Sequence, residues 1–225
     1  MSDPAERLDG AARAKLQKVL ELLAEERASV SSVVDERAWQ VHVIDSLTGL
    51  EVAELRETAR IADIGAGAGF PGLVLAVALP ETQVDLIESV GRKCEFMRHA
   101  IEAAGIPNAT VLNTRSEDLA AADGRETYDT VTARAVGRLS TLSELASPLL
   151  KPNGLLVAWK GKRDAEEENQ LENAAEALAM HPEQILDVGD RAGSTHRHLH
   201  IIRKTGPTPA NLPRKPGIAK KRPKG

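Results

Sequence analysis

The stretch that decides the fold is Ile61-Ala-Asp-Ile-Gly-Ala-Gly-Ala-Gly-Phe-Pro-Gly72, in which three glycines alternate with alanines. A short apolar run precedes the glycines, and Pro71 and a second apolar run follow them. This order predicts a strand, a tight turn and a helix start, because glycine adopts positive φ freely and proline is tolerated in a first helical turn. A turn without side chains lets a ligand approach the backbone closely, so we predict a nucleotide-like cofactor there.

The glycine spacing distinguishes between two classes of cofactor. A dinucleotide site has Gly-x-Gly-x-x-Gly, but here Phe70 takes the third glycine position and Gly69 comes one residue early. Asp63 stands just before the first glycine, and its carboxylate suits an ammonium and a sulfonium better than a pyrophosphate. The pattern resembles the first motif of Rossmann-like class I S-adenosylmethionine-dependent methyltransferases. The alternative is a turn that only connects a strand to a helix.

Composition indicates one soluble globular domain, the default for 225 residues. No apolar run reaches the roughly 20 residues that span a bilayer, and the first ten residues do not resemble a secretion signal. The single cysteine, Cys94, excludes an internal disulfide and is typical of a reducing compartment. We therefore expect a cytoplasmic monomer with no membrane partner.

The charges are unevenly distributed along the chain. Residues 1–190 contain all 33 acidic residues and 19 basic ones, a formal charge of −14, whereas residues 191–225 contain ten Lys or Arg and no acid. This asymmetry predicts contact with a polyanion, because phosphates attract a basic segment whatever its sequence. The alternative is a disordered tail that only improves solubility.

Apolar spacing predicts an N-terminal helical cap over residues 1–58, a methyltransferase domain over 59–205 and a basic, Pro-rich tail over 206–225, all within a single globular unit. Strands alternating with helices predict an α/β, mainly parallel, doubly wound sheet, with the last two strands as an antiparallel pair at one edge. The predicted helices of the cap cover 5–28 and 34–48. The predicted strands cover 60–64, 83–88, 109–112, 128–134, 154–160, 184–188 and 198–204, and the helices between them cover 71–79, 91–105, 138–150 and 165–180.

Polar residues at the ends of these strands are candidates for holding the cofactor. Glu88 ends the second strand, where a carboxylate can accept both ribose hydroxyls. Ser116 and Glu117 follow the third strand and are placed to meet the adenine, although Ser116 followed by acids is also a helix-capping signal. Arg134 ends the fourth strand, where it can orient the acceptor, bind phosphate or pair with the cofactor carboxylate.

Missing residue types restrict the methyl acceptor. Cys94 lies on a predicted helix after the second strand, so the thiolate chemistry of cytosine C5 methylation is unsupported. The fourth strand is not followed by the Asn/Asp-Pro-Pro-aromatic turn common in adenine amino methylation. A ring nitrogen such as guanine N7 needs only alignment with the methyl group, because it has its own lone pair.

The histidines are not interpreted as catalytic or metal-binding residues. His42 is interpreted as a surface or capping residue, and the alternating His196, His198 and His200 as a strand face rather than a metal site.

Taken together, these residues resemble the bacterial small-subunit ribosomal RNA guanine-N7 methyltransferase family, RsmG or GidB, over roughly residues 30–220. The matching pieces are Val41-His42-Val-Ile-Asp45-Ser46-Leu, Asp63 to Gly72, Leu86-Ile-Glu88-Ser with Arg92, Lys93 and Phe96, Arg115-Ser-Glu117, Thr132-Ala-Arg134-Ala, Trp159-Lys160-Gly161 and Leu212-Pro213-Arg214-Lys-Pro-Gly217. The resemblance implies methylation of N7 of one guanine in 16S ribosomal RNA near the decoding region, with naked RNA or the small subunit as partner.

The resemblance also implies which residues bind the cofactor. The family's contacts fall on Gly65, Phe70, Ser116, Glu117 and Arg134, where Ser116 replaces a more usual alanine. Asp63, Gly67, Gly69 and Glu88 are added from the fold argument, and Lys160, Arg214 and Lys215 are candidates for RNA phosphate contacts. Two alternatives are a small-molecule methyltransferase of the same fold and a non-enzymatic RNA-binding protein. Deletion of residues 205–225 should leave the turnover of a small-molecule methyltransferase intact but weaken activity on RNA.

Overall fold

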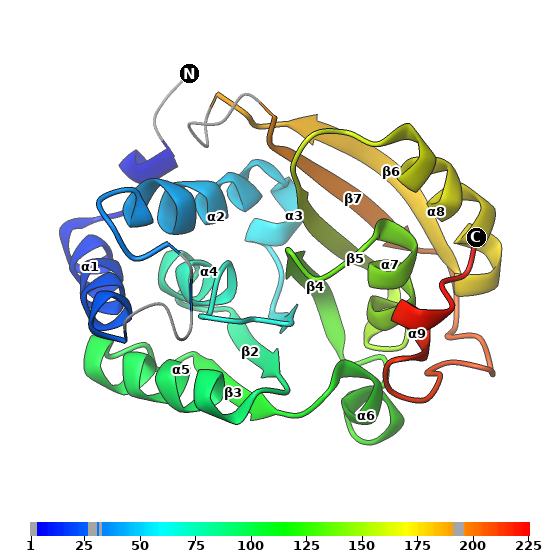
Figure 1. The fold of residues 1–225 in the computed structure, drawn as a ribbon, viewed down its shortest axis with the longest axis horizontal. Coiled ribbons are helices and arrows are strands. Elements are labelled where there is room, and N and C mark those ends of the chain that lie inside the picture. The colour runs from blue at the N-terminus through cyan, green and yellow to red at the C-terminus, as the bar shows by residue number, and fades with distance from the viewer. Residues whose placement is uncertain (1–3, 27–30, 32, 191–195) are drawn as a thin grey trace.

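The computed structural model describes residues 4–26, 31, 33–190 and 196–225. Within them, a seven-stranded sheet has the strand order β3-β2-β1-β4-β5-β7-β6 (Figure 1). The strands are β1 (Arg60–Ile64), β2 (Gln83–Glu88), β3 (Ala109–Asn113), β4 (Tyr128–Arg134), β5 (Leu150–Lys160), β6 (Met180–Asp187) and β7 (His198–Lys204).

The pairing of the strands confirms the predicted architecture. Strands β3, β2, β1, β4 and β5 pair in parallel, whereas β7 is antiparallel to both β5 and β6. Strand order reverses between β1 and β4, and a doubly wound sheet binds its ligand beyond the carboxyl ends of the strands at such a switch point. The fold therefore places the glycine turn where a ligand is expected.

Helices cover both faces of the sheet, so successive side chains along a strand are buried in two different hydrophobic cores. Ile61 belongs to the core shared with the helices of residues 10–25, 72–78 and 91–104, whereas Ala62 and Ile64 belong to the core shared with the helices of residues 139–146 and 165–178. This follows from the two-residue period of side chains along a strand. The helices are α4 (Gly72–Ala78), α5 (Gly91–Ala104), α6 (Ser116–Ala121), α7 (Leu139–Ala146), α8 (Ala165–Leu178) and α9 (Ile218–Lys221).

The N-terminal cap contains shorter elements than predicted. They are η1 (Pro4–Arg7), α1 (Gly10–Glu25), the π-helical η2 (Trp39–Ile44), α2 (Asp45–Leu47), η3 (Thr48–Glu51) and α3 (Ala53–Arg56). Asp9 begins α1 by accepting a hydrogen bond from the Ala12 amide, as an N-cap does. Leu16 and Leu47 are buried in the same core as Leu73 of α4. The cap is thus packed onto the sheet, and the boundary at residue 58 stays a prediction.

Residues 205–225, called here the C-terminal segment, pack against the sheet domain. Leu212 and Ala219 are each 3% exposed, and α9 contacts α7 (Figure 1). The alternative of a disordered, solubilising tail is therefore wrong. Long-range contacts with acidic residues, among them Glu126 and Glu144, hold this segment in place.

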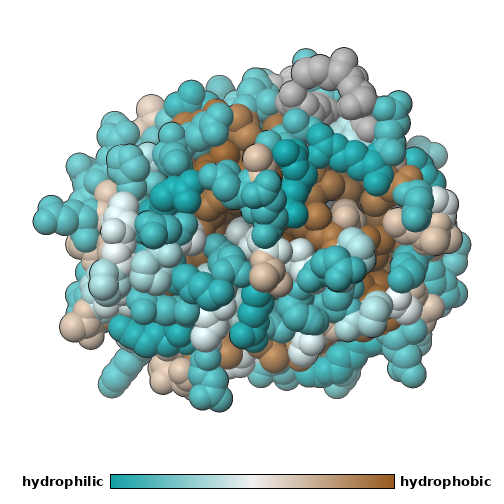
Figure 2. Space-filling model, turned by 180° about the vertical axis from the view of Figure 1, so that it is seen from behind, coloured by the Kyte–Doolittle hydropathy of each residue, from teal (hydrophilic) through white to brown (hydrophobic). Residues whose placement is uncertain are grey.

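The molecular surface viewed from the side opposite to Figure 1 is mostly hydrophilic at its rim, and apolar residues are visible mainly in recessed central areas (Figure 2). In the part of the chain that the structure describes, no helix combines the length and the apolar character required to cross a bilayer.

Candidate active site

The glycine turn has the backbone conformation that its sequence predicts. Gly65, Gly67 and Gly69 have φ values of +64°, +60° and +92°, in the left-handed region that other residues avoid. A Cβ on Gly65 would lie 2.7 Å from Cγ2 of Val136, so this position also lacks the space for a side chain. The Ala66 amide donates to the Ile87 carbonyl at 3.1 Å, which ties the turn to the end of β2.

Asp63 lies beneath this turn and is fully buried. Its Oδ2 accepts from the Gly72 amide at 2.9 Å, and its Oδ1 accepts from the Thr132 hydroxyl at 2.9 Å. Burial raises the pKa of Asp63 to about 7, against the opposing effect of these hydrogen bonds. The carboxylate therefore joins β1, β4 and the start of α4, and it does not line the cleft where the sequence argument expected it to meet a cationic ligand.

Glu88 lies at the tip of β2, as predicted, and holds the turn from the other side. Its Oε2 accepts from the Gly67 amide at 3.1 Å and its Oε1 from the Val90 amide at 2.9 Å. Each oxygen uses one acceptor position, so each keeps capacity for a ligand hydroxyl. The side chain lines the cleft at the carboxyl edge of the sheet.

A cleft of about 230 Å³ lies beside these residues. It brings together four predicted cofactor residues from three separate regions of the chain, whereas Asp63, Gly67, Gly69, Phe70 and Arg134 are not among those that line it. The four are Gly65, Glu88, Ser116 and Glu117, and the other lining residues include Ile64, Thr114, Val136, Thr141, Gly217, Ala219 and Lys220.

Ser116 and Glu117 begin α6 at the floor of this cleft. Arg115 is the N-cap, and Ser116 is the first helical residue, with its hydroxyl donating to Oε2 of Glu117 at 3.2 Å. The alternative in which the Ser116 side chain caps the helix is therefore wrong. Oε1 of Glu117 accepts from the Gly217 amide at 2.8 Å, a contact with the C-terminal segment that the sequence argument did not foresee.

Arg134 ends β4, but its side chain turns toward the N-terminal cap. Its Nη1 donates to the Val41 carbonyl at 2.8 Å and to Oδ2 of Asp45 at 2.9 Å, while Nη2 lies 3.2 Å from Nδ1 of His42. The guanidinium carbon is also 5.8 Å from the centre of the Phe70 ring. Arg134 therefore connects the cap to the glycine turn.

His42 is a residue whose position the sequence argument missed. It is 6% exposed and stacks on Phe70 with ring centres 4.5 Å apart, so its interpretation as a surface or capping residue is wrong. Burial is the largest effect on His42 and lowers its pKa. Because Nδ1 faces the Arg134 donor, Nε2 carries the proton and donates it to the Val33 carbonyl at 2.9 Å.

Asp45 is the second residue that was missed, and it lies between two arginines. Arg134 approaches one oxygen, and Nε of Arg197 lies 2.6 Å from the other. The side chain of Asp45 is 2% exposed, and burial of this kind normally requires an opposite charge. His42 and Asp45 are three residues apart in a helical stretch, and that spacing, which puts both on one face, was the available signal.

A second hollow of about 370 Å³ lies next to this cluster. It is lined by Ser31, Val33, Val41, His42, Arg134, Ala135, Trp159, Lys160, Gly161 and Arg197. Three of these are cationic, and Arg134 stands at the end of β4 beside Ala135 and Val136, the latter on the wall of the first cleft. The two hollows thus lie on either side of one turn.

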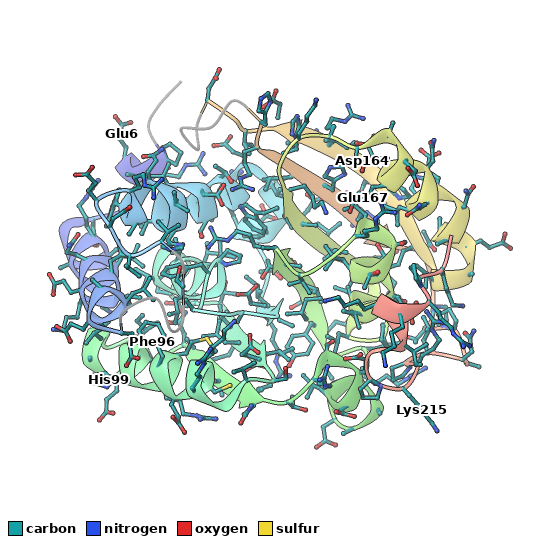
Figure 3. The ribbon with its side chains drawn as sticks, viewed as in Figure 1. Glu6, Phe96, His99, Asp164, Glu167 and Lys215 are labelled. Atoms are coloured by element: carbon teal, nitrogen blue, oxygen red, sulfur yellow. The ribbon has the colours of Figure 1, made fainter. Side chains whose placement is uncertain are left out.

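Two of the three predicted RNA contacts are engaged inside the protein. Lys160 donates to Glu167 at 2.6 Å, and Arg214 donates to both oxygens of Glu144 at 2.5 Å. Lys215 is exposed on the C-terminal segment, and Glu167 lies on α8 (Figure 3). The structure therefore lends no support to RNA binding by Lys160 or Arg214 and leaves Lys215 available.

Residues that might have suggested other chemistry are accounted for. Among the described residues, His, Cys, Asp and Glu side chains form no group of three or more able to hold a metal ion. Cys94 is buried on α5, where burial raises its pKa, and its thiol donates to the Glu88 carbonyl at 3.2 Å.

Comparison with known proteins places the chain in a family. The family model described as GidB, rRNA small subunit methyltransferase G, matches residues 13–200. The chain belongs to this family. A ribosomal RNA small subunit methyltransferase G from Rubrobacter xylanophilus is 41% identical over 186 residues, covering 81% of this chain and 71% of the relative. The family member from Bacillus subtilis is 36% identical over 200 residues, covering 88% and 84%.

Solved structures show the same fold. A SAM-dependent methyltransferase from Aquifex aeolicus superposes with a TM-score of 0.56 at 19% identity, covering 76% of this chain and 94% of its own. The expected class I methyltransferase architecture is thereby confirmed.

Proposed function

We propose that this chain transfers a methyl group from S-adenosylmethionine to N7 of one guanine in 16S ribosomal RNA. The observation that carries the proposal is the hydrogen bond from the Gly67 amide to Glu88, at 3.1 Å, which fixes a carboxylate at the strand end over a cleft. In doubly wound folds a carboxylate at this place accepts ribose hydroxyls. Membership of the GidB family supplies the methyltransferase and small-subunit rRNA parts of the proposal.

Each predicted cofactor residue has a proposed part. Glu88 accepts the ribose hydroxyls with its remaining lone pairs, and Ser116 and Glu117 face the adenine. The backbone of Gly65, Gly67 and Gly69 surrounds the amino acid end, close to Phe70. Asp63 acts from below, by holding the turn against α4. A direct contact between Asp63 and the cofactor stays a prediction.

The reaction requires positioning more than acid–base catalysis. When bound, the cofactor supplies a methyl group on a positively charged sulfur, which guanine N7 accepts with its own lone pair. Arg134 orients the acceptor, because its contacts with Val41, His42 and Asp45 hold the guanidinium and leave N–H groups for guanine O6. Holding two reactants in line removes much of the entropic barrier to such a transfer.

The proposed partner is 16S ribosomal RNA, either naked or within the small subunit. Lys215 is the predicted phosphate contact that the fold leaves exposed, and its positive charge suits an RNA phosphate. We further propose that the protein is cytoplasmic and acts as a monomer, and gel filtration tests the oligomeric state.

Calorimetry with S-adenosylhomocysteine tests the cofactor site. The wild-type protein should bind it, and Glu88→Ala should weaken binding about tenfold or more, because a charge-assisted hydrogen bond contributes about 1.5–3 kcal/mol. Glu81→Ala is the matched control, since Glu81 is exposed before β2 and outside the cleft. Absence of binding to the folded wild-type protein would remove the proposal.

Mass mapping of modified guanines tests the acceptor. Ribosomal RNA from cells with and without the gene should differ by one 7-methylguanosine in the small-subunit RNA. Identical maps, together with turnover of a small molecule, would favour the small-molecule methyltransferase instead. Identical maps without any methyl transfer to isolated subunits would favour a non-enzymatic RNA-binding protein.

A further inference from the structure

The cofactor cleft has one wall that comes from the far end of the chain. Gly217, Ala219 and Lys220 line it together with Glu88 and Ser116, although about 100 residues separate them from α6. The cleft of about 230 Å³ is smaller than the roughly 300–1,000 Å³ of most small-molecule sites. With the C-terminal segment in place, the enclosed space therefore suits the adenosine end of a cofactor rather than the whole molecule.

Acidic residues of the sheet domain hold the start of this segment. Glu126 accepts from Lys204 at 2.8 Å and from both the amide and the hydroxyl of Thr208 at 2.7 Å. Arg125 then donates to the Leu212 carbonyl at 2.9 Å. These contacts set the path of the chain before it reaches the cleft.

The middle of the segment is held by the pair between Arg214 and Glu144 on α7. Both guanidinium contacts are 2.5 Å long, and the side chain of Glu144 is only 3% exposed. A buried carboxylate without a partner is costly, so the pair with Arg214 favours docking of the segment at this position. Exposed RNA-binding tails do not require such a pair.

The end of the segment is fastened at the cleft itself. Gly217 has a φ of +80°, which turns the chain so that its amide reaches Oε1 of Glu117 at 2.8 Å. The Thr141 hydroxyl lies 3.4 Å from the Ala219 carbonyl on the neighbouring wall. Glu117 thus holds the segment and also lies at the proposed adenine position.

We propose that the C-terminal segment is part of the cofactor site and closes over the adenosine, with the contact between Gly217 and Glu117 as its fastening and Lys220 facing the bound nucleoside. This inference rests on the proposed function, because it takes the cleft to be the cofactor cleft. It means that the segment must open for the cofactor to enter and must close to exclude water from the nucleoside. Loss of residues 205–225 would then impair turnover of any acceptor, so it cannot distinguish an RNA substrate from a small molecule.

Calorimetry with S-adenosylhomocysteine tests whether the segment contributes to affinity. A chain lacking residues 214–225 should bind at least tenfold more weakly, provided that circular dichroism shows it folded. Lys220→Ala in the full chain should bind severalfold more weakly, whereas Lys221→Ala should bind as the wild type does, because Lys221 is exposed and does not line the cleft. Unchanged affinity of Lys220→Ala and of the folded shortened chain would overturn the inference.

Limited proteolysis of the full chain tests the closure independently. Trypsin can cleave after Arg214, Lys220 and Lys221, whereas Lys215 and Arg222 precede prolines and are resistant, and saturating S-adenosylhomocysteine should slow cleavage at the three sites at least fivefold. Cleavage that is unchanged or faster would show that the ligand does not draw the segment closed. If the wild-type protein fails to bind the ligand at all, the proposed function falls as well. If the wild-type protein binds the ligand but cleavage of the C-terminal segment is not slowed, only the closure is overturned.

Discussion

The glycine turn and the C-terminal segment both line the same cleft, yet different interactions hold them in place. The turn is shaped by local backbone, with three positive φ values within five residues. The segment is shaped by ion pairs across 70 residues or more, such as Arg214 with Glu144. The comparison indicates that a short-range motif can be read from neighbouring residues, whereas a docked segment depends on partners that the fold brings to it.

Replacing the glycines one at a time should have the largest effect and tests the local side of this comparison. Gly65→Ala should lose about 2–5 kcal/mol of unfolding free energy, because it adds a left-handed strain of about 1–2 kcal/mol to a clash with Val136. Gly67→Ala should lose only the strain, since its Cβ meets nothing closer than 3.8 Å. Chemical denaturation measures both, and equal losses would show that packing against Val136 is unimportant to the turn.

Removing the arginine of the C-terminal segment should have an intermediate effect. Arg214→Ala leaves the buried Glu144 unpaired and should cost about 1–3 kcal/mol, less than for a fully buried pair because Arg214 is 24% exposed. Amide exchange in residues 205–225 should rise, while exchange around residues 61–72 should not. Lys215→Ala is the matched control, and a similar cost for both variants would contradict the ion-pair account.

Acidification should have the smallest effect on the free energy of unfolding. The contributions of Glu126, which holds the C-terminal segment, and of Asp63, which holds the glycine turn, should change in opposite directions. Hydrogen bonds from Lys204 and Thr208 lower the pKa of Glu126 to about 2, so its contribution is present above the unfolded pKa of about 4.3 and is lost as pH falls toward 2. After allowance for solvent, since its side chain is 31% exposed, we expect Glu126→Gln to cost about 1 kcal/mol at neutral pH.

The Glu126→Gln penalty should shrink between about pH 5 and pH 2. Asp63 behaves in reverse, because burial raises its pKa to about 7. Its protonated form is favoured in the folded protein, so its contribution is present below about pH 3.9 and declines as pH rises toward 7. Denaturation of Glu126→Gln and Asp63→Asn at several pH values measures the two slopes, and slopes of the same sign would contradict this distinction.

Much of the sheet was predictable because its strands are short, apolar and bounded by turn residues. The bounds of β1, β2, β4 and β7 match the prediction residue for residue. Strand β5 begins at Leu150, whereas the prediction began it at residue 154 because Pro152 and Gly154 suggest a break. In the structure the strand continues through these residues, because its pairing with β4 contains a register shift there. Strand β6 likewise tolerates Pro182, since it lies at the edge of the sheet.

The site was predictable where a residue follows directly from the end of a strand. Glu88, Ser116 and Glu117 meet at the cleft for that reason. The orientation of Asp63, whose carboxylate bonds to Gly72 and Thr132, was not predictable, because sequence order shows only that a carboxylate precedes the turn. The contact of Arg134 with His42 and Asp45 joins residues about 90 positions apart, and no local pattern contains such a distance.

The amino-acid sequence by itself determined the glycine turn, the alternation of strands and helices and the acid at the tip of β2, since each depends on backbone preferences and periodicity within a few residues. Only the tertiary structure decided that Arg197, Lys204 and Arg214 pair with acidic residues far away in the sequence. The physical reason is that the attraction between two charges falls off with distance, so a charge pairs with whichever opposite charge the fold places within a few ångströms. Basic residues near the end of the chain therefore pair with carboxylates that are distant in sequence but close in the folded structure.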